Sequence, residues 1–90
     1  MLEINLDKRA DKFTRKLPHK QEGQIGRKLA LLLAFPFPHD SKHLKGMDWY
    51  CVDVGEYRII YNVHGNVLDV PLIGKRNDNE VYKRLKRMNG

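Results

Sequence analysis

The chain has 90 residues, 41% hydrophobic and 31% charged, which predicts one soluble globular domain rather than a disordered chain. A lone cysteine excludes a disulfide framework and a cysteine-rich zinc site, and the histidines lack metal-ligand spacing, so we expect no metal and no cofactor. No apolar run approaches the roughly 20 residues that span a bilayer, and the acidic N-terminal segment is unlike a signal peptide. We therefore expect a cytoplasmic protein with no membrane partner.

The charge is strongly basic, with 17 Lys and Arg against 11 Asp and Glu and a formal net charge of +6. Such a balance favours a polyanionic partner, such as nucleic acid, a ribosome, a membrane surface or an acidic protein, although general solubility is the simpler explanation. The cations gather in two stretches, residues 8–28 and 75–87. This clustering favours nucleic acid or an acidic protein as the partner.

The first half of the chain predicts a strand followed by two helices. Residues 2–6 alternate between apolar and polar, as in a strand with one buried face. Asp7 can cap a short helix, and a second helix is predicted from about His19 to Ala34, where two prolines follow and stop it. Two helices joined at a proline favour a helical hairpin on one face of a sheet. A polar loop is expected through Gly46.

The second half predicts an antiparallel meander and a last helix. Pro71 cannot donate a ladder hydrogen bond, so we expect a bulge or an unpaired edge there. Alternation puts Arg58 opposite the core face formed by Tyr57, Ile59 and Tyr61, on a ligand-facing side. The strands are predicted over residues 49–54, 57–64 and 67–73, with two-residue turns at 55–56 and 65–66. The order β, α, α, β, β, β, α predicts a single α+β domain over residues 1–90.

Four short segments follow one another at a characteristic spacing. They are Lys42 to Gly46 (KHLKG), Gly55 to Tyr61 (GEYRIIY), Gly74 to Arg76 (GKR) and Glu80 to Tyr82 (EVY). In this order, in a short basic chain, they resemble the RelE/ParE superfamily, the toxin halves of type II toxin–antitoxin pairs. The resemblance covers nearly the whole chain and implies the RelE-like microbial RNase fold.

The resemblance also implies a function and partners. RelE-like members are ribosome-dependent endoribonucleases that cut messenger RNA in the decoding site, whereas ParE-like members poison gyrase on the same fold. The arginines and the tyrosine to which RelE catalysis is attributed match Arg58, Arg76 and Tyr82, which favours the nuclease branch. The implied partners are a RelB-like antitoxin, the ribosome and mRNA, with promoter DNA contacted only through the antitoxin complex.

The chemistry suits these residue types. Cleavage of RNA by its own 2′-hydroxyl requires removal of a proton, stabilisation of a charged phosphorane and protonation of the leaving 5′ oxygen, and preplaced cations make a metal unnecessary. Arginine stays charged and offers a planar fork to phosphate oxygens, while Tyr82 stacks on a base or assists proton transfer. The candidates for binding the RNA backbone are Lys42, Lys45 and Lys75, with His43 as a weaker one. The resemblance makes a basic helical face a ribosome contact, formed by Lys8, Arg9, Lys12, Arg15, Lys16, Arg27 and Lys28.

One departure from RelE bears on activity. RelE carries two lysines on the strand before the Tyr-Arg hairpin, and here those positions hold Cys51 and Asp53. Asp53 is then the base, or one of the three candidate lysines substitutes, or activity is low. The departure motivates an alternative function: a ParE-like gyrase inhibitor, or a toxin that only binds its antitoxin. An Arg58 buried in an ion pair would weaken the nuclease hypothesis.

Each catalytic candidate also has a purely structural interpretation. Arg58 is then an exposed strand residue, Arg76 a basic residue flanking a helix, and Tyr82 part of the packing of the last helix. The interpretations differ in one observable respect. Catalysis requires that the three side chains converge on one patch.

Overall fold

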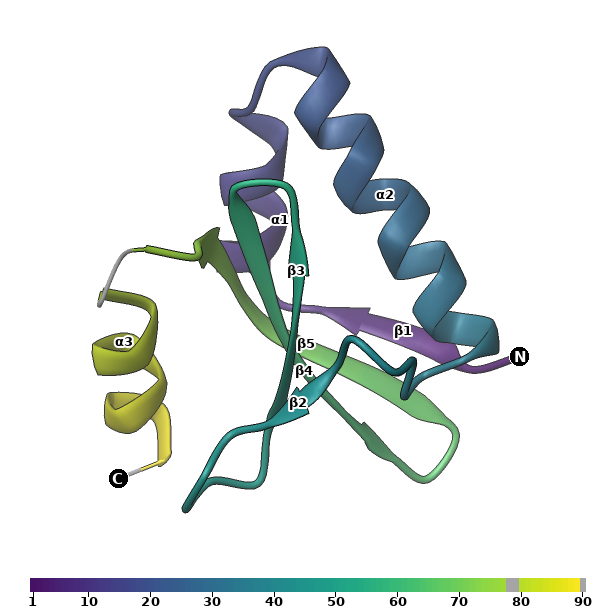
Figure 1. The fold of residues 1–90 in the computed structure, drawn as a ribbon, viewed down its shortest axis with the longest axis vertical. Coiled ribbons are helices and arrows are strands. Elements are labelled where there is room, and N and C mark those ends of the chain that lie inside the picture. Colours follow the sequence, from purple (N-terminus) through teal and green to yellow (C-terminus); the bar gives the residue numbers. More distant parts are fainter. Residues whose placement is uncertain (78–79, 90) are drawn as a thin grey trace.

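The computed structural model describes residues 1–77 and 80–89, with the side chains of residues 82–87 in the last helix. Its order confirms the predicted α+β class, with helices early and strands late. The elements are β1 (Glu3–Leu6), α1 (Lys8–Arg15), α2 (His19–Ala34), β2 (Lys42–His43), β3 (Tyr50–Val54), β4 (Tyr57–His64), β5 (Val67–Lys75) and α3 (Glu80–Asn89) (Figure 1). Within the described ranges, no helix has the length and apolarity needed to cross a membrane.

The strands form one sheet in the order β1-β5-β4-β3-β2. The meander of β3, β4 and β5 is antiparallel as predicted, and β1 joins β5 in parallel. The polar loop predicted through Gly46 requires a correction, because Lys42 and His43 pair with β3 as a two-residue strand. A strand this short has no apolar alternation, so periodicity could not reveal it.

Both predicted hairpins are present. Gly55 and Gly65 have φ of +58° and +61°, the left-handed conformation that glycine adopts without steric cost. The predicted irregularity at Pro71 is also confirmed. Between the pairs Ile60–Leu72 and Asn62–Asp69, β5 holds two residues where β4 holds one, which is a bulge.

One face of the sheet is covered by α1 and α2. The Asp7 side chain caps α1 by accepting from the Arg9 backbone N–H at 2.9 Å, and Pro18 precedes α2. The fully buried residues of this main core come from both helices and all the longer strands. They include Ala10, Ile25, Leu32, Val52, Ile59, Tyr61 and Leu68.

The other face carries α3, so that the sheet lies between α3 and the α1–α2 pair (Figure 1). Leu85 of α3 is fully buried against Cys51, Ile60 and Leu72. The middle of the side predicted to face a ligand is therefore a second small core. Polar side chains remain at the two ends of β4 on this face, at Arg58 and at His64.

Candidate functional site

Arg58 stands at the start of β4, directly opposite Asp53 near the end of β3. Cross-strand partners point to the same side of a sheet, so the hairpin itself brings these two side chains together. Arg58 Nε donates to Asp53 Oδ1 at 2.7 Å, and Nη2 donates to Oδ2 at 3.3 Å. The Arg58 side chain is 19% exposed and the Asp53 side chain is 40% exposed. The pair is therefore forked and partly open to solvent.

Tyr82 completes this cluster from α3. Arg58 Nη1 donates to the Tyr82 hydroxyl oxygen, and the guanidinium carbon lies 5.7 Å from the centre of the tyrosine ring. Tyr82 is half-buried, so its ring packs at the edge of α3 while its hydroxyl reaches the arginine. The packing of α3 through Leu85 thus brings together side chains that are up to 29 positions apart in the chain, counted from Asp53 to Tyr82.

The charges of the cluster reinforce one another. The hydrogen bond from Arg58 lowers the pKa of the Asp53 carboxyl, and the positive charges of Arg58, Arg76 and Lys42 lower it further against a burial effect in the opposite sense. The hydrogen bond to Asp53 in turn raises the pKa of Arg58. Both groups are therefore charged at neutral pH, and Asp53 is a weak base.

Arg76 and Lys42 lie on the same side as Arg58. Arg76 follows β5, where its backbone N–H donates to the Glu56 carbonyl at 3.0 Å, and its side chain is exposed. Alternation from Gly74, the partner of Arg58, directs Arg76 to this face. Lys42 is the partner of Cys51, which faces α3. Together with Arg58 they make a basic patch around Asp53, which we call the arginine site (Arg58, Arg76, Tyr82, Asp53 and Lys42).

Two of the other phosphate-binding candidates, Lys75 and His43, lie on the opposite face from the arginine site. Lys75 pairs with Tyr57, which packs on the main-core face. The His43 ring contacts the Tyr50 ring on that same face, with centroids 5.0 Å apart. Lys45 is exposed in the loop after β2. Strand register, which residue spacing alone does not give, separates Lys75 and His43 from Lys42.

Cys51 and Asp53, which the resemblance to RelE aligns with two lysines, lie in different environments in the structure. Cys51 is 4% exposed in the second core, and burial raises the pKa of its thiol. It is a packing residue rather than a nucleophile. Asp53, two residues on, is exposed and paired, so only this position contributes a polar group to the arginine site.

The predicted ribosome-contact residues lie on α1 and α2, which cover the opposite face of the sheet from the arginine site. Three of the seven are engaged in ion pairs: Arg9 with Asp7, Arg15 with Asp11, and Lys28 with Asp40. Lys28 is also largely buried, with 18% of its side chain exposed. The remaining four are exposed cations: Lys8, Lys12, Lys16 and Arg27.

A second polar cluster at the far end of β4 was not anticipated, and we call it the histidine cluster (His64, Asp69, Asp48, Asn62 and Asn5). His64 Nδ1 lies 2.6 Å from Asp69 Oδ2, and Nε2 lies 3.5 Å from Asp48 Oδ2. Asn62 Nδ2 donates to the Asp48 carbonyl at 2.8 Å, and Asn5 Nδ2 donates to Asp69 at the same distance. One sequence pattern could have indicated this cluster: Asn62 and His64 alternate along β4 with residues of the main core.

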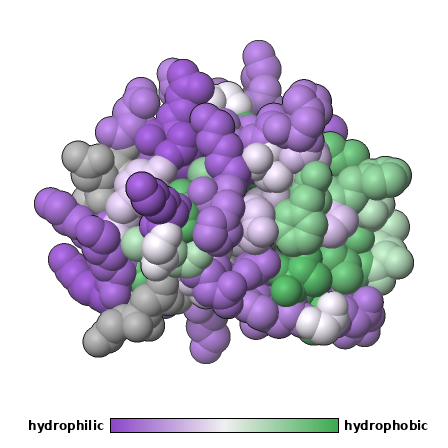
Figure 2. Space-filling view, turned by 60° about the horizontal axis from the view of Figure 1, so that its bottom comes forward, coloured by the Kyte–Doolittle hydropathy of each residue, from purple (hydrophilic) through white to green (hydrophobic). Residues whose placement is uncertain are grey.

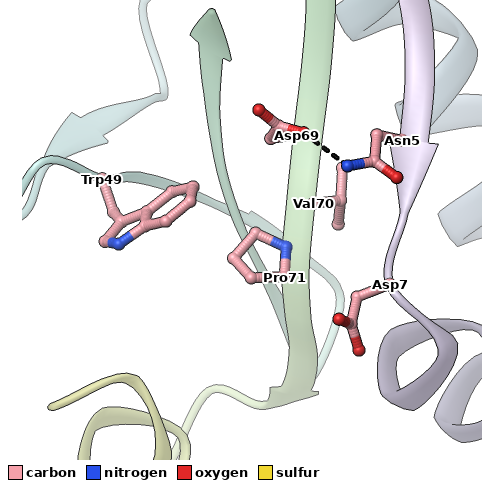
Figure 3. Close-up of a pocket in the computed structure, with 6 residues that line it drawn as sticks. All are labelled: Asn5, Asp7, Trp49, Asp69, Val70 and Pro71. Atoms are coloured by element: carbon pink, nitrogen blue, oxygen red, sulfur yellow. Dashed lines mark hydrogen bonds between the residues drawn. The ribbon is translucent and has the colours of Figure 1, made fainter. Parts of the chain in front are cut away.

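Beside the histidine cluster lies a hollow of about 140 Å³. Figure 3 shows Trp49 on one side of it, and Pro71 and Asp69 of β5 with Asp7 on the other. Its carboxylates make it unsuited to phosphate. Among residues 1–77 and 80–89, no group of three or more His, Cys, Asp or Glu is arranged to hold a metal ion.

Comparison with known proteins places the fold. No protein-family model matches the chain, and no curated protein sequence matches it with significance. Solved structures do match it: the isolated E. coli RelE toxin is 33% identical, with a TM-score of 0.74 over 98% of this chain and 99% of that one. The chain belongs to the RelE toxin family. It is therefore a toxin of the type II toxin–antitoxin class.

A second structure agrees with this family assignment, and a third agrees with the fold. A chain of the intact E. coli RelBE toxin–antitoxin complex is 30% identical, with a TM-score of 0.74 over 87% of this chain and all of that one. The archaeal RelE–RelB complex of Pyrococcus horikoshii is 23% identical, with a TM-score of 0.75 over 84% of this chain and 96% of that one, and supports the fold alone.

Proposed function

We propose that this toxin is a metal-independent endoribonuclease that cuts mRNA on the ribosome through attack of the RNA 2′-hydroxyl, and so inhibits translation. The products are a 2′,3′-cyclic phosphate or 3′-phosphate end and a free 5′-hydroxyl. The observation that supports this most directly is the convergence of Arg58 and Tyr82 in one contact, with the charges of Arg76 and Lys42 around it. Such preplaced cations stabilise a phosphorane without reorganisation.

Each group has a role in this proposal. Arg58 and Arg76 stabilise the charge on the transferring phosphate, and Lys42 binds the RNA backbone. Tyr82 orients or stacks a base, or assists proton transfer. The group that accepts the 2′ proton is Asp53 or Lys42. Asp53 is ionised but weakly basic beside Arg58, so its use as the base requires a change of its environment when RNA binds.

The proposed contacts with mRNA and with ribosomal RNA lie on opposite faces of the sheet. The arginine site accepts the mRNA on the α3 side. The exposed cations of α1 and α2, on the other side, suit the phosphates of ribosomal RNA. A substrate on the ribosome implies that the toxin acts in the cytoplasm, where translating ribosomes are found.

We also propose a RelB-like antitoxin as the cognate partner, because RelE from E. coli and from P. horikoshii has been solved in complex with RelB. Exposed apolar patches on a small protein mark protein–protein interaction sites. Figure 2 shows apolar side chains gathered on one side of the molecule. The large apolar side chains that are most exposed are Met1, Ile4, Leu31, Phe35 and Phe37. Promoter DNA is then contacted through the antitoxin complex.

The test is a primer-extension cleavage assay on mRNA in programmed ribosomes, with wild type, Arg76→Ala and Tyr82→Phe compared. We expect cleavage within the decoding site, reduced about 10- to 1000-fold in Arg76→Ala by loss of an electrostatic donor, and reduced to a smaller extent in Tyr82→Phe. Lys20→Ala is the matched control, because Lys20 is an exposed cation outside the proposed contacts. Metal independence is measured separately on the slow cleavage of free RNA in EDTA.

A second candidate function, a toxin that binds its antitoxin or gyrase without cutting RNA, is favoured by one observation. The Arg58 guanidinium is already engaged by the Asp53 carboxylate. This candidate predicts no cleavage in the same assay while E. coli RelE cleaves on the same ribosomes. Gyrase supercoiling and antitoxin capture would then be measured.

A further inference from the structure

The guanidinium of Arg58 is largely occupied before any substrate arrives. Nε and Nη2 donate to the two oxygens of Asp53, and Nη1 donates to the Tyr82 hydroxyl. These contacts use at least three of the five N–H groups of the side chain. The Nε and Nη2 groups, which would bind a phosphate in a bidentate contact, are therefore already bound to the Asp53 carboxylate.

The carboxylate matches a phosphate in the features that matter to arginine. It presents two oxygens, carries negative charge and accepts two roughly parallel N–H bonds, as a phosphate does in a bidentate contact. Its setting is also that of an anion site, because Arg76 and Lys42 both act on it electrostatically. Asp53 thus occupies the position where the patch binds an anion.

The two partners differ in how freely they can move. Arg58 is the more buried, with 19% of its side chain exposed against 40% for Asp53, and Tyr82 holds it from a second direction. Asp53 has a short side chain, and Arg58 supplies the only hydrogen bonds to its carboxylate within the described part of the chain. If the pair opens, Asp53 turns outward while Arg58 keeps its place beside Tyr82.

We propose that Asp53 is an internal counter-ion that occupies the phosphate position of Arg58 in the free toxin, and that an RNA phosphate must displace it to bind. This deepens the proposed function and rests on it only for the identity of the anion. Displacement lowers the apparent affinity for phosphate, because only the fraction of molecules with an open pair binds it. Asp53 is thereby a positioning residue that keeps Arg58 oriented and limits anion binding at the site.

The test is a titration of the intact protein with inorganic sulfate, a doubly charged stand-in for phosphate, followed by the NMR signal of the Arg58 Nε–H. At constant ionic strength, Asp53→Asn is expected to bind sulfate about two- to fivefold more tightly than wild type, the range that an ion pair of this exposure provides. Asp53→Ser serves as a second variant. The chemical-shift dispersion of the amide NMR signals verifies that both variants are folded.

Asp11→Asn is the matched control. Asp11 is also paired with an arginine, at 3.1 Å from Arg15 Nε, and its side chain is 38% exposed. The substitution therefore changes the net charge by the same amount and opens the same kind of pair away from the arginine site. Sulfate affinity in Asp11→Asn should stay at the wild-type value.

An Asp53→Asn affinity equal to that of wild type or of Asp11→Asn would overturn the proposal. So would a weaker affinity, which would mean that Asp53 supports the anion site rather than competes for it. The titration contains neither ribosomes nor RNA. Its outcome is therefore distinct from that of the cleavage assay.

Discussion

The two ends of β4 on the α3 side carry cation–carboxylate pairs of nearly equal length and different chemistry. Arg58 lies 2.7 Å from Asp53, and His64 lies 2.6 Å from Asp69. The first cation is permanent and has further cations around it. The second is a histidine whose pKa is raised by its hydrogen bond with Asp69, and it has a second carboxylate, Asp48, beside it. The neighbours of a pair, rather than the pair itself, decide whether an end of the sheet attracts phosphate.

The packing of α3 separates the two ends further. Leu85 anchors α3 over the middle of the face, and Tyr82 of that helix reaches Arg58. The histidine cluster instead borders an open hollow (Figure 3). The Arg58–Tyr82 contact therefore depends on the packing of α3, while the Arg58–Asp53 and His64–Asp69 pairs depend on strand register.

The largest expected effect tests this dependence on α3. Leu85→Ala removes a fully buried side chain from the second core and should cost about 2–5 kcal/mol of unfolding free energy, measured by urea denaturation. In the folded fraction the Arg58–Tyr82 contact should weaken, while the pKa of His64 stays at its wild-type value. A change at His64 as large as that at Arg58 would show that the two ends are coupled.

A second prediction compares two lysines that lie on opposite faces of the sheet. Lys42 shares the face of Arg58, and Lys75 pairs with Tyr57 on the main-core face. Lys42→Ala should lower cleavage on the ribosome about tenfold through loss of a phosphate contact, and Lys75→Ala about threefold or less. Equal effects would contradict the placement by register.

The third prediction concerns the titration of His64. The hydrogen bond with Asp69 raises the pKa of His64, and His64 in turn lowers the pKa of Asp69. Asp69→Asn should therefore move the pKa of His64 down toward its ordinary value of about 6.5. NMR titration of the imidazole measures this, with Asp53→Asn, which removes the carboxylate at the other end, as the control that leaves His64 unmoved.

The smallest expected effect is the contribution of the same pair to stability. Because the pKa of His64 is raised in the folded state, its contribution is full below the unfolded pKa and is lost as the pH rises through the folded pKa. Asp69, with its lowered pKa, contributes above its unfolded pKa and loses that contribution in acid.

Asp69→Asn should therefore destabilise the protein more at about pH 5.5 than at about pH 9. The difference should be at most about 1 kcal/mol, because 46% of the His64 side chain is exposed. Unfolding curves at the two pH values measure it, and an equal cost at both would contradict the assignment.

Sequence reasoning was accurate where local rules apply. The bounds of α2, the two glycine turns and the bulge at Pro71 follow from residue preferences and alternation. It failed where the chain is brought together over long distances. The spacing of Lys42 and Lys75 in the sequence does not indicate on which face of the sheet each lies. Tertiary packing determines that β1 pairs with β5 and that α3 covers the second core.

Sequence reasoning named the residues of the candidate site but did not predict that Arg58 is already paired with Asp53. The resemblance identified Arg58, Arg76 and Tyr82, and alternation put Arg58 on the correct face. The forked pair with Asp53 arises from the register of β3 against β4, which a residue pattern does not fix. The histidine cluster draws on β1, the loop before β3, β4 and β5, so no local motif predicted it.

The most direct test of the account is cleavage of mRNA in programmed ribosomes by Arg58→Ala and His64→Ala, which alter the cation at each end of β4. The account predicts that Arg58→Ala lowers cleavage about 100- to 1000-fold, as expected for loss of a transition-state donor, while His64→Ala stays within about threefold of wild type. Full cleavage by Arg58→Ala, or an equal loss in both variants, would contradict the assignment of RNA cleavage to the arginine site.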